Sequence, residues 1–86
     1  MMLLVVEDEW LIARELELSL IRCGYNADIV SNGADALTYV SQKTYDCILM
    51  DLQLSTGMNG IETAMELNKN YDIPVIFITG HSDPDT

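Results

Sequence analysis

Short, wholly apolar runs alternate along this chain with longer segments in which apolar residues recur at helical spacing. Continuous apolar runs of this length are typical of strands that are buried on both faces of a parallel sheet. Four strands are predicted on this basis, at residues 3–6, 27–30, 47–50 and 74–78. The second run is the weakest of the four, and the fourth leads into Thr79 and Gly80.

The segment after the first strand predicts an amphipathic helix over about residues 8–23. Asp8 can cap its start, and Gly24 closes it because glycine readily adopts the conformation that ends a helix. Its buried face is expected to consist of Ile12, Leu16, Leu20 and Cys23.

Two further helices are expected. The sequence Ser31-Asn32-Gly33 supplies cap and turn residues for a second helix that runs to about Ser41. The expected buried residues of this second helix are Ala36, Leu37 and Val40. A loop follows at residues 54–60, and after it a third helix is marked by Ile61, Ala64, Met65 and Leu67. Strands that alternate with helices build a parallel sheet covered on both faces, so the predicted fold class is α/β and doubly wound.

Composition narrows the range of functions. The 86 residues carry 4 basic against 14 acidic side chains, a net charge of −10, which repels nucleic acid phosphates and anionic lipid head groups. Direct nucleic acid binding and membrane attachment are therefore not expected, and no apolar run approaches the ~20 residues of a membrane helix. Cys23 and Cys47 lack metal-ligand spacing and lie in apolar stretches, which predicts small, reduced core residues and a cytoplasmic location.

Polar residues follow three of the predicted strands at their carboxyl ends, where ligands bind in sheets of this kind. Glu7 and Asp8 follow the first strand, Asp51 follows the third, and Thr79 follows the fourth. We expect these side chains to converge over one edge of the sheet. Carboxylates in so small a volume repel one another unless a cation lies among them, and Mg²⁺ prefers such oxygen ligands.

A carboxylate can also act as a nucleophile and form an aspartyl phosphate, with hydrogen-bond donors that offset charge on the transferred group. Asp51 is the candidate nucleophile, and Thr79 is a candidate donor. Each residue alone has an ordinary structural interpretation, because Asp after a strand is often a cap or turn residue and Thr favours strands. The joint occurrence of all four polar residues is what favours a functional site.

Four segments resemble the signatures of the receiver domains of two-component response regulators, and the match covers essentially the whole chain. These segments are Val5-Val6-Glu7-Asp8-Glu9, Cys47-Ile48-Leu49-Met50-Asp51-Leu52, Met58-Asn59-Gly60-Ile61-Glu62 and Pro74-Val75-Ile76-Phe77-Ile78-Thr79-Gly80. The resemblance implies a flavodoxin-like receiver fold with strand order 2-1-3-4 in a single domain over residues 1–86. In this predicted fold, the chain resembles the chemotaxis regulators of the same family.

The resemblance also implies a function. A sensor histidine kinase, or a histidine phosphotransfer domain, would pass a phosphoryl group from its phosphohistidine to Asp51, and a conformational change would relay the signal. Such a domain is a signalling acceptor rather than an enzyme, with at most self-phosphorylation from small donors and self-dephosphorylation. Mg²⁺ or Mn²⁺ would be held by Glu7, Asp8, Asp51 and the backbone carbonyl of Gln53, and Thr79 and Gly80 would bind the phosphoryl group and take part in the switch.

Two departures from the family pattern change the expectation. The stretch at residues 54–58 is one residue longer than the commonest family loop and lacks its usual proline. The chain is also expected to be incomplete at its C-terminus, where the family has a fifth strand, two more helices and a lysine that pairs with the phosphoryl group. Neither Lys43 nor Lys69 is expected to replace this lysine. We therefore expect weak switching, and self-association through the first helix, where Leu11 and Leu18 lie off the main apolar stripe, or through the fourth-strand edge.

Two other classes of function remain open at this point. The first is a receiver-like interaction module that is never phosphorylated. The second is a phosphohydrolase with an aspartyl-phosphate intermediate, a class that requires a second Asp two positions after the nucleophile, where this chain has Gln53.

Overall fold

The predicted alternation of strands and helices is confirmed in a computed structural model, which describes residues 1–78. The elements in chain order are β1 (Met2–Val6), α1 (Trp10–Arg22), β2 (Asn26–Val30), α2 (Gly33–Gln42), β3 (Cys47–Asp51), α3 (Gly60–Asn68) and β4 (Val75–Ile78). Thr79 and Gly80, which the sequence analysis assigned to the site, lie outside the described residues. The helices of the described part include none that is long and apolar enough to cross a membrane.

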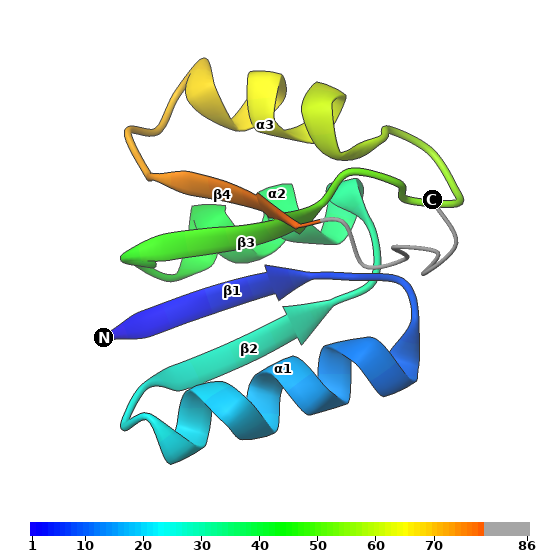
Figure 1. Cartoon of the computed structure of the whole chain (residues 1–86). Helices are drawn as coiled ribbons and strands as arrows, with labels where there is room; N and C mark the ends of the chain where they lie inside the picture. Colours follow the sequence, from blue (N-terminus) through cyan, green and yellow to red (C-terminus); the bar gives the residue numbers. More distant parts are fainter. Residues whose placement is uncertain (79–86) are drawn as a thin grey trace.

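The strands form one parallel sheet in the order β2-β1-β3-β4, which confirms the doubly wound class and the order implied by the resemblance. All four arrows point the same way in Figure 1, so the carboxyl ends of the strands meet at one edge of the sheet. Helix α1 lies on one face, and α2 and α3 lie on the other (Figure 1). This arrangement places the loops after β1 and β3 side by side.

The main core lies between the sheet and the pair of helices α2 and α3. Alternate side chains of a strand point to the same face, so Leu4 and Val6 of β1 join Ile48 and Met50 of β3 in this layer. All four side chains are fully buried. The helices contribute Ala36, Val40 and Leu67 to the same cluster.

Helix α1 differs from its prediction at both ends. Its N-cap is Glu9, without a side-chain capping hydrogen bond, so the prediction that Asp8 caps the helix was wrong. Cys23 is exposed and Cys47 is only half-buried, so neither is the core residue that was predicted, although both are free thiols. Gly24 does close the helix, and its φ of +91° is a conformation in which a residue with a side chain would be strained.

The starts of α2 and α3 follow from local capping chemistry. The Asn32 side chain accepts a hydrogen bond from the Asp35 N–H at 2.8 Å, which confirms the predicted cap. Asn59 and Glu62 form a reciprocal capping box at the start of α3. The predicted third helix is confirmed; of the residues that marked it, Ala64 and Leu67 are buried together with Gly60 and Thr63, whereas Ile61 and Met65 are exposed.

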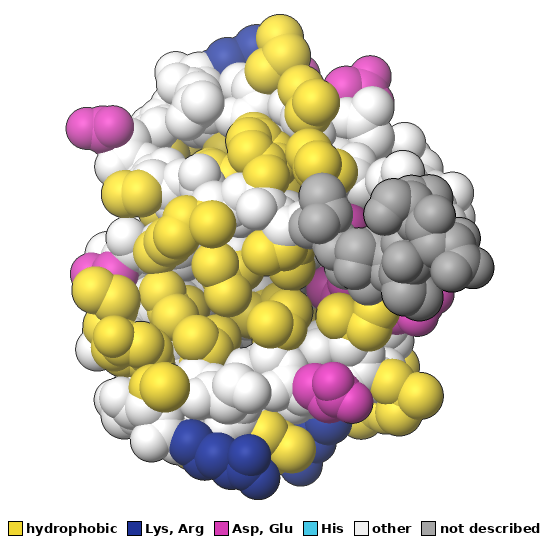
Figure 2. Space-filling view, viewed as in Figure 1, with side chains coloured by type: hydrophobic (Ala, Val, Ile, Leu, Met, Phe, Trp, Pro, Cys, Tyr) yellow, Lys and Arg dark blue, Asp and Glu magenta, His cyan; other side chains and the backbone are white. Residues whose placement is uncertain are grey.

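Apolar side chains remain exposed on α1 and β4. Leu11 is 73% exposed and Leu18 is 39% exposed, as expected from their position off the apolar stripe. In β4, Ile76 is 54% exposed and Phe77 is 43% exposed, so the prediction of a strand buried on both faces was wrong. Figure 2 shows hydrophobic side chains gathered across the middle of the viewed face.

A polar contact joins the connection between α2 and β3 to strand β2. The Tyr45 hydroxyl donates to Asp28 Oδ2 at 2.6 Å, and the Lys43 ammonium donates to the same oxygen at 2.9 Å. Burial raises the pKa of the Asp28 carboxyl, but the bonds from Tyr45 and Lys43 outweigh it, and the pKa is lowered from 3.8. Because Tyr45 is 3% exposed, its hydroxyl is a buried group that needs this partner.

We predict that Tyr45→Phe lowers the free energy of unfolding at pH 7 by about 1–2 kcal/mol, the usual cost of removing one partner of a charged hydrogen bond. Urea denaturation followed by circular dichroism measures the change. A group whose pKa is depressed in the folded state stabilises above its unfolded pKa, so the difference should shrink as the pH falls through the folded pKa of Asp28. Tyr39→Phe, at an exposed tyrosine of α2, is the control and should change stability by less than about 0.5 kcal/mol.

Candidate functional site

Three acidic side chains converge at the carboxyl edge of the sheet. Strands β1 and β3 pair in parallel with Val6 opposite Met50, so the residues that come next, Glu7 and Asp51, lie side by side. One carboxylate oxygen from each of Glu7, Asp8 and Asp51 lies within 4.8 Å of the others. The structure thus brings together the three carboxylates that the sequence placed at strand ends.

Two of the three acids are almost completely buried. Glu7 and Asp51 are each 1% exposed, whereas Asp8 is partly exposed. Glu7 is fixed by its backbone, because its N–H extends the β1–β2 ladder by donating to the Val30 carbonyl at 3.0 Å. Within the described part of the chain, Glu7 Oε1 and Asp51 Oδ2 are buried without a hydrogen-bond partner. Buried carboxylate oxygens left in this way are costly, so the pair requires a shared proton or a cation.

The electrostatics of the pair agree with its geometry. Burial, and after it the neighbouring Asp51 carboxylate, raises the pKa of Glu7 to about 8. The Glu9 N–H, which donates to Glu7 Oε2 at 3.2 Å, acts in the opposite direction but is outweighed. Glu7 therefore keeps its proton to a higher pH than an ordinary glutamate does.

The loop after β3 supplies backbone donors to the other oxygens of the site. The Gln53 N–H donates to Asp51 Oδ1 at 3.1 Å, and the Ser55 N–H donates to Asp8 Oδ2 at 3.0 Å. Hydrogen bonding from the Ser55 hydroxyl, and to a smaller extent from the Ser55 N–H, lowers the pKa of the Asp8 carboxyl, against burial, which raises it. Asp8 is therefore ionised at neutral pH and is held by the loop.

Gly60 lets the first turn of α3 lie against the backbone of Asp51. Its N–H donates to the Leu52 carbonyl at 3.2 Å. A Cβ at position 60 would collide with the carbonyl oxygen of Asp51. The glycine is thus required by a close backbone approach, and it allows the start of α3 to lie against the end of β3.

The remaining predicted site residues have different outcomes. The Gln53 N–H contacts Asp51, while the role of the Gln53 carbonyl stays a prediction. Thr79 and Gly80 lie outside the described residues. Sequence reasoning missed Ser55, because a backbone N–H leaves no trace in the residue type. The one available signal was that the loop lacks a proline, the residue that has no N–H.

The donor set fits a hard divalent cation. All three ligand candidates are carboxylates, and two buried oxygens lack partners in the described residues. Mg²⁺ is usually held by one or two carboxylates with retained waters, and Mn²⁺ accepts the same oxygen donors. Exposure of Asp8 leaves one side of the cluster open to solvent.

Comparison with known proteins gives a consistent result. The family model described as the response regulator receiver domain matches residues 3–86. The chain is 41% identical over 81 residues to the response regulator ArlR of Staphylococcus saprophyticus subsp. saprophyticus and 40% identical to that of Staphylococcus aureus strain Mu50, in each case over 94% of this chain and 36% of the relative. The chain therefore spans about a third of the length of these curated relatives.

Solved structures with the same fold include response regulators. The chain is similar to response regulator TrrA from Thermotoga maritima in complex with Mg²⁺-BeF, with a TM-score of 0.86 and 34% identity over 94% of this chain and 70% of that one. It is also similar to a chain of the complex between histidine kinase ThkA and TrrA, with a TM-score of 0.86 and 32% identity over 99% of this chain and 73% of that one.

We predict that Glu7→Gln stabilises the protein in the presence of a chelator at pH 8 by about 1–2 kcal/mol. A carboxyl group whose pKa is raised in the folded state keeps a proton that the unfolded chain has released. Stability therefore falls as the pH rises from 4.5, the ordinary value, to about 8. The amide of glutamine can donate to Asp51 without titrating, so this loss should disappear in the variant.

Urea denaturation at pH 5.5 and pH 8, with chelator present, measures both effects. Glu15→Gln, which changes an exposed glutamate of α1, is the matched control and should preserve the wild-type pH dependence. An unchanged pH dependence in Glu7→Gln would show that the buried pair does not share a proton.

Proposed function

The chain belongs to the response regulator receiver domain family, and we propose that its Asp51 accepts a phosphoryl group in a reaction that requires a divalent cation. The observation that carries the proposal is the convergence of three carboxylates around a buried Asp51 whose Oδ2 has no partner among the described residues. Asp51 Oδ1 is held by the Gln53 N–H at 3.1 Å. The second oxygen is thus the one available to bond phosphorus.

The cation is Mg²⁺ or Mn²⁺ in this proposal, held by the carboxylates of Glu7, Asp8 and Asp51 and by the backbone carbonyl of Gln53. When bound, it offsets the negative charge of the carboxylates and of the incoming phosphoryl group. Cation binding would release the Glu7 proton to solvent, because an ionised carboxylate is the ligand form. Thr79 and Gly80 remain the proposed phosphoryl-binding and switch residues on the evidence of the sequence alone.

The transfer is a displacement at phosphorus. A bond forms between Asp51 Oδ2 and the phosphorus atom, and the bond from phosphorus to the imidazole nitrogen of a phosphohistidine breaks, which leaves a neutral histidine after protonation. The proposed donor is a sensor histidine kinase or a histidine phosphotransfer domain. Support comes from TrrA, a similar regulator known in complex with histidine kinase ThkA.

The domain is proposed to act as a signalling acceptor without turnover of an external substrate, apart from self-phosphorylation and self-dephosphorylation. The cytoplasm remains its proposed location, because both cysteines are free and disulfides are rare there. The proposed function does not require direct contact with nucleic acid or membrane, in line with a net charge of −10.

We predict self-association through the outer strand of the described sheet. Strand β4 lies at one edge, and Ile76 is 54% exposed and Phe77 is 43% exposed, so a second copy could cover this surface. Light scattering at several concentrations should show a dimer, and Ile76→Lys should shift it to the monomer. A monomer at all concentrations in the wild type would contradict the prediction.

Phosphoryl acceptance is tested by incubation with acetyl phosphate and Mg²⁺ followed by intact mass measurement. We expect an adduct of one phosphoryl group that is labile at alkaline pH, as an acyl phosphate is. Asp51→Asn should abolish it, and Asp46→Asn, at an exposed aspartate before β3, should not. An absent adduct in the wild type would favour the unphosphorylated interaction module, and turnover of a phosphomonoester would favour the phosphohydrolase.

A further inference from the structure

We propose that the backbone N–H of Ser55 is a positioning group for the cation site, because it holds the Asp8 carboxylate turned toward the other two acids and so raises the affinity for a divalent cation. The inference rests on the proposed function, since it takes the three carboxylates as the ligands. It deepens that function by assigning part of the affinity to a loop residue whose side chain carries no charge.

The contact itself is specific. Ser55 donates to Asp8 Oδ2 at 3.0 Å across a separation of 47 residues, so it joins the loop after β3 to the residues that follow β1. Asp8 does not cap α1, whose N-cap is Glu9. The orientation of the Asp8 carboxylate is therefore set by the loop rather than by its own helix.

A buried leucine anchors the loop after β3 in the hydrophobic core. Leu54 is 9% exposed and belongs to the main hydrophobic cluster, whereas its neighbours Gln53 and Ser55 are exposed. The N–H groups on either side of Leu54 donate to two different acids, that of Gln53 to Asp51 and that of Ser55 to Asp8.

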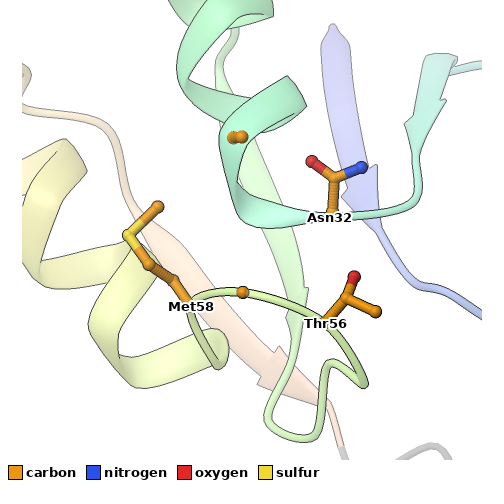
Figure 3. A pocket seen from close by; sticks show the side chains of 5 residues that line it. Asn32, Thr56 and Met58 are labelled. Carbon is orange, nitrogen blue, oxygen red and sulfur yellow. The ribbon is translucent and has the colours of Figure 1, made fainter.

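The part of the loop beyond Ser55 faces the start of α2. Beyond Ser55, the loop borders a hollow of about 320 Å³ between itself and the start of α2 (Figure 3). The lining residues are Asn32, Ala34, Thr56, Gly57 and Met58. Near the acids, the loop is held by the buried Leu54 side chain and by the hydrogen bonds that the Gln53 and Ser55 N–H groups donate.

The bond is compatible with cation binding by the same carboxylate. A carboxylate has two oxygens with about four lone-pair sites, and the Ser55 N–H takes one site on Oδ2. Oδ1 stays available, and a ligand that is already oriented needs less rearrangement when the cation arrives. Loss of hydrogen bonds to metal ligands typically costs 10–100-fold in affinity.

The test is a titration of the whole 86-residue chain with Mg²⁺ and with Mn²⁺ by isothermal titration calorimetry. Ser55→Pro removes the N–H and should weaken binding about tenfold or more. Ser55→Ala keeps the N–H but removes the hydroxyl, which also lowers the pKa of Asp8, so it should lose less affinity than Ser55→Pro. Thr56→Pro is the matched control, since it removes from the same loop an N–H that donates no backbone hydrogen bond within the described residues, and it should stay within about threefold of the wild type.

The outcomes separate the inference from the proposed function. Equal affinity of Ser55→Pro and wild type would overturn the inference alone. An equal loss in Ser55→Ala would assign the effect to the hydroxyl, and an equal loss in Thr56→Pro would assign it to general loop rigidity, and either would also overturn it. A wild type that binds neither cation would overturn the inference together with the proposed function.

Amide hydrogen exchange at Ser55, followed by NMR in the wild-type protein, needs no variant. The proposal expects Ser55 to be protected without cation and equally or better protected at saturating Mg²⁺. A bond that competes with the cation would instead lose its protection on binding, and that result would overturn the proposal. Urea denaturation of each variant in chelator separates a change of affinity from a change of folding stability.

Discussion

The repulsion between two buried carboxylates, Glu7 and Asp51, is the constraint around which the site is built. Parallel pairing of β1 with β3 forces these residues together, since Val6 lies opposite Met50 and each acid is the next residue along. Neither side chain can turn to solvent, because each is 1% exposed. Folding therefore creates an unfavourable pair that a proton relieves in part and a divalent cation relieves more fully.

The surrounding structure holds this pair in place. The β1–β2 ladder extends to the Glu7 N–H, the glycine at position 60 allows α3 to lie on the backbone of Asp51, and the loop after β3 donates one N–H to Asp51 and one to Asp8. Each of these contacts uses backbone groups, so the geometry of the site depends on the path of the backbone. Stability given up at the acids is recovered elsewhere, in the apolar cluster between the sheet and helices α2 and α3.

The two faces of the sheet are covered unequally in the described residues. Helices α2 and α3 cover one face and α1 covers part of the other, so apolar residues of α1 and β4 stay exposed. The curated relatives are longer, since this chain spans 36% of ArlR from Staphylococcus saprophyticus subsp. saprophyticus. The acidic cluster lies at the carboxyl ends of the two central strands, β1 and β3, in the interior of the sheet, so its geometry depends on pairing that is present in the described residues.

The sequence by itself determined the elements and the three acids. Apolar runs marked the strands, Asn32 marked a helix start, and position after a strand marked Glu7, Asp8 and Asp51, because these signals are local. Only the tertiary structure decided that Asp8 meets the loop instead of capping α1 and that Cys23 is exposed. Helical periodicity shows that a helix has an apolar side, but contacts between residues far apart in the chain decide what covers it and which backbone N–H reaches which carboxylate.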